Sequence, residues 1–205
     1  MFDATRPLII AAAILHALPA AADPMLAPTV DYIADVAITR GTDHAVGIPV
    51  RYVYGGRQLR IDQVGIVTLV DLDRRHTVTM IPRVRTYWHP VGLREPAADG
   101  RRWVGVEAQS AEPVGQDMIL GHSVTKYHVR GTIFDTRTPF EGDVWTTAEN
   151  IVMRVDGMGT VDRFTSPIKV DTVQLAIGPV DRELFSVPSN FARASKSHPP
   201  PSADD

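Results

Sequence analysis

The sequence predicts a mainly β protein, built as a single strongly curved antiparallel sheet (an incomplete barrel) with little helix. From Asp31 onward, apolar and polar residues alternate with period 2 in short runs, which is typical of strands with one buried face. Turn-forming residues bound these runs, and no helical pattern of about 10 to 15 residues separates them, so consecutive strands are expected to pair as antiparallel neighbours. With 205 residues, 44% of them hydrophobic and 22% charged, the chain is long enough to bury a core.

Residues 1–22 are expected to be a cleaved signal peptide. A short stretch with one arginine precedes an apolar run over residues 8–18, and the small residues Ala20 and Ala22 stand just before Asp23. The alternative, an N-terminal membrane anchor, requires an apolar run of about 20 residues, which is longer than this one. We therefore expect the mature protein to begin at Asp23 and to be periplasmic or secreted.

The clearest strand signal is a hairpin over residues 48–62, IPVRYVYGGRQLRID. Gly55 and Gly56 are expected to form its turn, because a tight two-residue hairpin turn needs positive φ angles. Tyr52 and Tyr54 fall on one face of the first strand, because side chains alternate along a strand. Further strands are expected at residues 64–72, 76–81, 119–129 and 167–178, and a second hairpin at residues 143–155 is expected to turn at residues 148–150.

Residues 119–131, ILGHSVTKYHVRG, raise the question of an active site, but we interpret them as a strand. Adjacent side chains point to opposite faces, so His122 and Ser123 cannot form a base and nucleophile pair. His122 and His128 share a face but lie about 20 Å apart along a strand, too far to bind one metal ion. The solvated face is expected to carry His122, Lys126, His128 and Arg130, and the core face Ile119, Thr125, Tyr127 and Val129.

Three other patterns lack what a catalytic, metal or cofactor site requires. Residues 71–77 start as a calcium loop does but have neither the later glycine nor the distal glutamate, so a strand-end turn is expected. Residues 157–160, GMGT, lack the third glycine of a dinucleotide loop and are expected to be a hairpin turn. The spacing of Asp135, Glu141 and Asp143 does not by itself define an acid–base pair. We therefore expect no enzyme activity, no catalytic residue, no metal and no cofactor.

The amino-acid composition argues against thiol chemistry and against nucleic acid as a partner. The chain has no cysteine, so neither disulfides nor thiol chemistry is expected. Its net charge of −3 gives no electrostatic reason to bind nucleic acid, and loss of residues 1–22 removes one acid and one base without changing that charge. Downstream of the signal peptide, the longest apolar run, residues 64–70, is too short to cross a bilayer as a helix. The mature chain is therefore expected to lack a transmembrane segment.

Residues 23–191 are expected to form one domain. Their least regular part, residues 89–103, is expected to be a long loop, and residues 89–115 hold the only room for a helix. Residues 192–205 are small, polar and proline-rich, so this tail is expected to be disordered.

The order of several short motifs resembles the half-barrel proteins of the bacterial cell envelope. This LolA/LolB/RseB-like superfamily includes periplasmic lipoprotein carriers, and the likeness is greatest to its uncharacterised secreted-domain branch. The resemblance covers residues 30–191. It rests on the tyrosine-rich GG hairpin, on the segment MIPRVRTYW, on Gly121, Lys126 and Tyr127 of a glycine-led strand, on a strand with Trp145, and on the closing residues Leu184, Phe185 and Pro188.

The resemblance implies an incomplete barrel closed over by helices, with an apolar cavity for acyl chains on its concave face. The implied function is a non-enzymatic periplasmic protein that binds a lipid or another amphiphile. Candidate lining residues, for which ordinary core packing is the alternative, are Tyr52, Tyr54, Met80, Tyr127, Trp145 and Met153. Arg83 and Arg85 are expected on one face of a strand, where they would meet an anionic headgroup at the rim. The alternative function is an envelope interaction or stress-sensing module without a small ligand, which would contact a protein partner through a sheet edge or the residue 89–103 loop.

Overall fold

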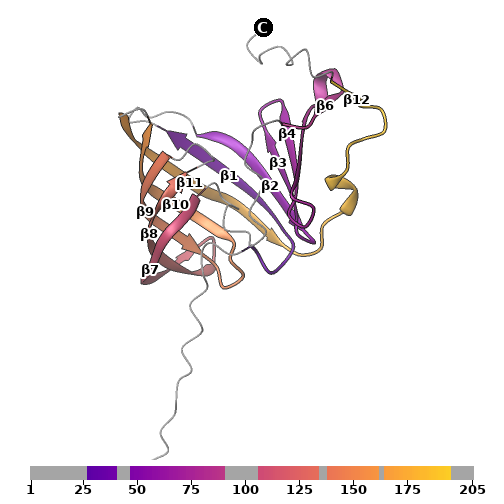
Figure 1. The fold of residues 1–205 in the computed structure, drawn as a ribbon. Coiled ribbons are helices and arrows are strands. Elements are labelled where there is room, and N and C mark those ends of the chain that lie inside the picture. The colour runs from indigo at the N-terminus through magenta and orange to yellow at the C-terminus, as the bar shows by residue number, and fades with distance from the viewer. Residues whose placement is uncertain (1–26, 41–46, 91–105, 134–137, 162–163, 195–205) are drawn as a thin grey trace, which may run out of the picture.

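The computed structural model describes residues 27–40, 47–90, 106–133, 138–161 and 164–194 (Figure 1). These residues form one open sheet with the strand order β12-β6-β5-β4-β3-β2-β1-β11-β10-β9-β8-β7. All neighbours are antiparallel except β12 and β6, which run parallel. The expected fold class, a curved and incomplete antiparallel barrel, is confirmed.

The strands form two meanders. The first comprises β1 (Tyr32–Arg40), β2 (Ile48–Gly55), β3 (Gln58–Gln63), β4 (Ile66–Asp71), β5 (His76–Ile81) and β6 (Thr86–Trp88). The second comprises β7 (Val106–Ile119), β8 (His122–Ile133), β9 (Thr138–Thr146), β10 (Val152–Val161) and β11 (Phe164–Ile177). The short strand β12 (Ala192–Arg193) follows near the C-terminus. The two meanders meet where β1 pairs with β11.

Helix is confined, in the described ranges, to two short 3₁₀ turns, η1 (Pro82–Val84) and η2 (Arg182–Phe185). The covering helices that the resemblance implies do not occur there, and residues 106–115, part of the room left for one, belong to the long strand β7. Among these residues there is also no helix of the length and apolarity needed to span a bilayer.

The register places one apolar surface across both meanders. Residues directly opposite each other on neighbouring strands share a face of the sheet. On β1 and β2 this face carries the pairs Tyr32–Tyr54 and Val36–Val50, which belong to one buried cluster. From β1 it continues across β11, β10, β9 and β8 through the successive partners Ile38, Val170, Val155, Val144 and Tyr127. We call this surface the apolar face.

Val170 links the two parts of the apolar face. It packs against the cluster on β1 and β2 and also against a second cluster that contains Tyr127, Val129, Phe140, Val144, Val155 and Ile168. The opposite surface, which we call the charged face, carries ion pairs along most of the sheet. On β4 and β5 it holds a third apolar cluster of Val67, Leu69, Val78 and Met80.

The C-terminal segment after β11 covers the third apolar cluster, because Val187 and Phe191 pack against it. The Arg182 guanidinium donates a 2.9 Å hydrogen bond to Asp31, just before β1. Arg60 of β3 donates a 3.1 Å hydrogen bond to the carbonyl of Leu184. The segment ends as β12, which pairs with β6.

The β2–β3 turn differs from the expected one. Its central residues are Gly56 and Arg57, with φ angles of 54° and 62°, whereas Gly55 is the last residue of β2. A side chain on Gly55 would collide with Val180 and Arg182 of the C-terminal segment. Gly55 is thus required by close packing and Gly56 by its positive φ.

The other turns and strands predicted from the sequence are partly confirmed. The turns at residues 71–77 and 148–150 are confirmed as the β4–β5 and β9–β10 connections. The turn predicted at residues 157–160 is wrong, because these residues lie inside β10. Residues 119–131 do not form one strand: Ile119 ends β7, Leu120 and Gly121 make a turn with φ angles of 51° and 79°, and β8 then begins at His122.

Arg83 and Arg85 do not lie on one face of a strand. Arg83 is inside η1 and Arg85 follows it with a φ of 51°, so both sit on an exposed turn between β5 and β6. The start of the tail also differs from expectation, because Ala192 and Arg193 pair with Thr86 and Tyr87. The predicted signal peptide, most of the residue 89–103 loop, Asp135 and residues 195–205 lie outside the described residues.

Gly142 and Gly157 are cross-strand partners on β9 and β10, and the ring of Phe140 lies over both of them. A Cβ on Gly157 would stand 2.6 Å from the carbonyl oxygen of Glu141 and 2.6 Å from the Phe140 ring. These contacts are too close for any side chain, so the two glycines allow the strands and the ring to pack together.

We expect the substitution Gly157→Ala to lower the free energy of unfolding by about 1–3 kcal/mol, because the added methyl group overpacks this site. Urea unfolding followed by circular dichroism measures the change. Gly115→Ala is the matched control, because nothing lies within 4 Å of a Cβ at that position. Equal stabilities of the two variants would contradict the close-packing explanation.

Candidate functional site

The apolar face holds three of the six candidate lining residues. Tyr52 and Tyr54 lie on it beside Ala34 and Tyr32 of β1, and Tyr127 lies on it beside Val144. Tyr54 and Tyr127 are buried, whereas Tyr52 is half-buried. The expected core-face assignment of Tyr127 and Val129 is therefore confirmed.

Met80 and Trp145 lie on the charged face. Met80 pairs with Val67 in the third apolar cluster, where the C-terminal segment covers it. Trp145 pairs with Lys126 and Arg154, and both cations lie over its ring, at 4.9 and 5.5 Å from the centroid. Met80 therefore does not line a common surface with the three tyrosines. Trp145 lies on the face of β9 opposite Tyr127, but its ring belongs to the same buried cluster as Tyr54.

Met153 is fully buried in the same cluster as Tyr54. It lies at an irregularity of the β9–β10 pairing, where the register shifts between Val152 and Arg154. Arg83 and Arg85 are exposed on the η1 turn and do not share a strand with any candidate lining residue.

Tyr32 and Tyr54 form an aromatic pair on the apolar face, with ring centroids 5.8 Å apart. Burial raises the pKa of the Tyr54 hydroxyl above its usual value, so this side chain is neutral over the physiological range. The pair therefore presents an uncharged aromatic surface.

Thr146 places a hydroxyl group within the apolar face. It pairs with Thr125 and Val152, its side chain is 0% exposed, and its Oγ1 has no hydrogen-bond partner. The neighbouring Thr172, by contrast, donates a 3.1 Å hydrogen bond to the carbonyl of Val152. A buried hydroxyl without a partner costs about 1–3 kcal/mol, so Thr146 leaves one polar atom unsatisfied inside the apolar face.

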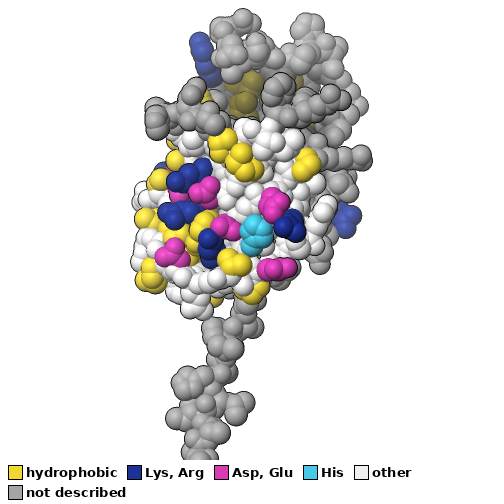
Figure 2. Space-filling model, turned by 90° about the vertical axis from the view of Figure 1, so that its left-hand side faces the viewer, with side chains coloured by type: hydrophobic (Ala, Val, Ile, Leu, Met, Phe, Trp, Pro, Cys, Tyr) yellow, Lys and Arg dark blue, Asp and Glu magenta, His cyan; other side chains and the backbone are white. Residues whose placement is uncertain are grey.

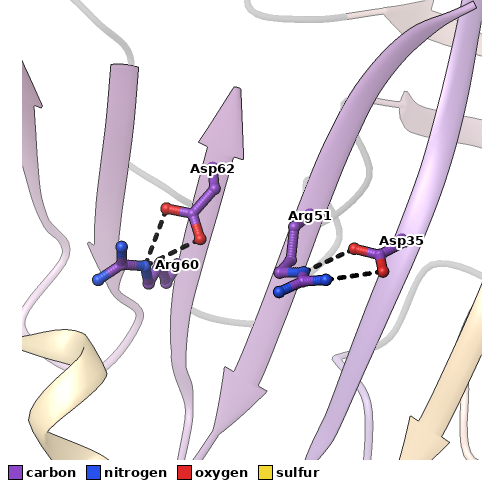
Figure 3. A network of polar contacts seen from close by, with 4 residues as sticks. All are labelled: Asp35, Arg51, Arg60 and Asp62. Carbon is purple, nitrogen blue, oxygen red and sulfur yellow. Dashed lines mark hydrogen bonds and ion pairs between the residues drawn. The ribbon is translucent and has the colours of Figure 1, made fainter. Parts of the chain in front are cut away.

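Ion pairs cover much of the charged face. On β1 and β2, Arg51 binds both carboxylate oxygens of Asp35, at 2.6 and 2.9 Å, and on β3 Arg60 binds Asp62 (Figure 3). The Arg51 guanidinium holds the pKa of Asp35 below its usual value. On the strands at the left of Figure 1, Figure 2 shows acidic and basic side chains side by side. The charges on this face thus largely neutralise one another.

His128 lies at the centre of one such group. Its Nδ1 is 3.0 Å from Asp143, its Nε2 is 3.4 Å from Glu141, and Lys126 binds Asp143 at 2.7 Å. The hydrogen bond to Asp143 is the main reason that the pKa of His128 is raised. Burial opposes ionisation of Asp143, but its hydrogen bonds to Lys126 and His128 outweigh that effect and lower its pKa. The sequence identifies these residue types, but only the β8–β9 register brings them together.

This group lacks the parts of a hydrolytic site. In the part of the chain that the structure describes, His128 hydrogen-bonds to carboxylates and to no hydroxyl, so it has no nucleophile to activate. No cluster of three or more metal-ligating side chains occurs among the same residues. His76 and His89 stack with their ring centroids 4.6 Å apart, and no third ligand joins them there.

Comparisons with known proteins give a likeness in fold. No protein-family model and no curated protein matches the chain. A LolA superfamily protein from Nitrosomonas europaea is similar at 10% identity and a TM-score of 0.40, over 80% of this chain and 93% of that one. A DUF1329 family protein from Desulfovibrio piger is similar at 9% identity and a TM-score of 0.38, over 77% and 90% of the chains.

The third solved structure is a putative outer membrane lipoprotein-sorting protein domain from Vibrio parahaemolyticus, at 9% identity and a TM-score of 0.31. It covers 76% of this chain and 89% of that one. The name of the first structure contains the LolA superfamily, which the sequence motifs resemble. The likeness concerns the fold alone.

We expect the stability of the protein to fall as the pH rises from below 6.5 into the alkaline range, because His128 then loses its proton. Its folded pKa is raised above the usual value of about 6.5, so its stabilising effect is fully present below that value and is lost as the pH passes the folded pKa. Urea unfolding midpoints measured across this range test the effect. The variant His128→Gln should flatten the profile, whereas a profile identical to that of the unchanged protein would show that His128 does not cause it.

Proposed function

We propose that the protein binds a lipid or another amphiphile along the apolar face and acts as a non-enzymatic, carrier-like protein. The observation that carries the proposal is that one apolar surface continues across β2, β1, β11, β10, β9 and β8 of a sheet that does not close. A soluble domain of this size needs a core, but an open sheet with an extended apolar face also suits an elongated hydrocarbon chain.

The side chains on this face fit an amphiphile rather than a purely apolar ligand. The aromatic pair of Tyr32 and Tyr54 and the aliphatic residues around Val144 suit an acyl chain. The unpaired hydroxyl of Thr146 suits an ester or carboxyl oxygen, to which it would donate a hydrogen bond. The ligand class therefore combines a hydrocarbon chain with an oxygen-bearing group.

The proposed lining consists of Tyr52, Tyr54, Tyr127 and Met153, with Thr146 as the polar contact. Met80 is left out, because it belongs to the third apolar cluster on the charged face. Trp145 is left out, because Lys126 and Arg154 lie over its ring. Arg83 and Arg85 remain exposed cations for a headgroup at the η1 end of the sheet. We place the protein in the periplasm or outside the cell, on the strength of the signal peptide expected at residues 1–22.

We expect a dansyl-labelled fatty acid to bind the protein saturably, and Tyr52→Ala to weaken this binding about tenfold through loss of an aromatic contact. Tyr52 is half-buried, so its substitution is compatible with folding, which circular dichroism verifies. Tyr87→Ala is the control, because it removes an equally half-buried aromatic ring that packs against the third apolar cluster on the charged face. Absence of saturable binding, or an equal loss in both variants, would count against a site on the apolar face.

Thr146→Val separates binding from folding. We expect it to raise the free energy of unfolding of the ligand-free protein by about 1 kcal/mol, because it replaces a buried and unpaired hydroxyl with a methyl group of similar shape. The same change should weaken binding of the dansyl-labelled fatty acid several-fold through loss of one hydrogen bond. A more stable variant with unchanged affinity would show that the hydroxyl does not contact the ligand.

A further inference from the structure

Strand β7 forms one edge of the sheet. Among the described residues its single strand neighbour is β8, so half of its backbone hydrogen-bonding groups face away from the sheet. Two irregularities interrupt its pairing with β8, between Ala108 and Ser110 and between Pro113 and Gly115. Residues 115–119 are the longest run of this edge without an irregularity. Exposed edges of this kind are templates for pairing with another strand.

The β7–β8 turn fixes which groups face outward. Ile119 and His122 flank a two-residue turn and therefore form a hydrogen-bonded pair. Because hydrogen-bonded and non-hydrogen-bonded pairs alternate, the N–H and C=O groups of Gln116 and Met118 point away from β8. The Met118 N–H agrees with this, since it donates a 2.7 Å hydrogen bond to the carboxylate of Asp117.

The same edge exposes large apolar side chains. Val114 is 54% exposed and Met118 is 62% exposed. Among the described residues, a Cβ on Gly115 would meet nothing within 4 Å, so there is open space beside the strand in that direction. The edge thus combines outward backbone groups with side chains that gain from contact with a partner.

We propose that two copies of this chain associate through antiparallel pairing of their β7 strands, about a two-fold axis at Gln116. In this register the two Gln116 residues face each other and exchange two backbone hydrogen bonds. Met118 of each copy lies opposite Val114 of the other, so the exposed apolar side chains cover one another. Asp117 lies opposite Gly115, so no like charges meet.

Neighbouring registers are less favourable. Moving the axis by one residue to Asp117 places the two Asp117 side chains opposite each other, a repulsive pair of carboxylates. Sliding one strand by a single residue would place a residue whose backbone groups point outward opposite a residue whose backbone groups point toward β8. The register centred on Gln116 avoids both defects.

The association is expected to be weak and reversible. Pro113 has no N–H, and the irregularity beside it limits the pairing to a few residues, so the buried area falls below that of a standard interface of about 1,600 Å². The Met118 N–H also exchanges its bond to Asp117 for one to the partner copy, which brings little net gain. The fraction of dimer should therefore rise with protein concentration, whether or not a ligand occupies the apolar face.

A single cysteine tests the register, because the chain has none of its own. In the proposed dimer, the two Cα atoms at position 116 lie about 5.5 Å apart, within the range that a disulfide spans. We expect Gln116→Cys to form a disulfide-linked dimer under mild oxidation, seen by non-reducing electrophoresis. Val64→Cys, at an equally open position that is 71% exposed in the β3–β4 turn, should form far less. Equal cross-linking of the two variants, or none at position 116, would overturn the proposal.

Sedimentation velocity over a range of concentrations tests the interface without cross-linking. Met118→Lys places two cations in the interface and should lower the dimer fraction at least several-fold. Met158→Lys is the matched control, because Met158 is 45% exposed on β10, away from the edge, and should leave dimerisation unchanged. A concentration-independent monomer, or a loss in both variants, would also reject the proposed dimer.

Discussion

The pairing of β1 with β11 is the constraint on which the rest of the structure depends. Each meander is made of local hairpins, and this one ladder joins them into a single sheet. Its register places Ile38 beside Val170, so the apolar surfaces of the two meanders meet on the same side. A slip of one residue would turn Asp35 and its neighbours toward the core, which is why the position of the irregularity between Asp35 and Val36 is strongly specified.

Most of the strands, but not the membership of the proposed site, could be predicted from the sequence. Period-2 alternation places β2, β3, β4, β5 and β11 closely, because it depends on local side-chain direction. Selecting aromatic and sulfur-containing residues by type mixed the two faces, so that Trp145 was grouped with Tyr127. Which face of the sheet a side chain joins depends on how its strand pairs with the neighbouring strands. That register shifts at irregularities such as the one between Val152 and Arg154, which no local pattern encodes.

The remaining differences arise from long-range packing. The sequence GG predicts a turn at Gly55 and Gly56, but the C-terminal segment needs the space over Gly55, and the positive φ falls instead on Gly56 and Arg57. The grouping of His128 with Glu141 and Asp143 likewise depends on which residues β9 places beside β8. Sequence identifies these residue types, whereas the sheet determines their partners.

The contact between Asp31 and Arg182 joins residues 151 positions apart, at the two ends of the described chain. A chain that emerges from the ribosome or crosses a membrane in N-to-C order must therefore hold β1 without its β11 partner until nearly all of it has passed. Closing so long a loop is entropically costly, and folding dominated by such distant contacts is slow. If the chain is exported as proposed, this delay keeps it unfolded during translocation and leaves completion of the sheet to the compartment where it arrives.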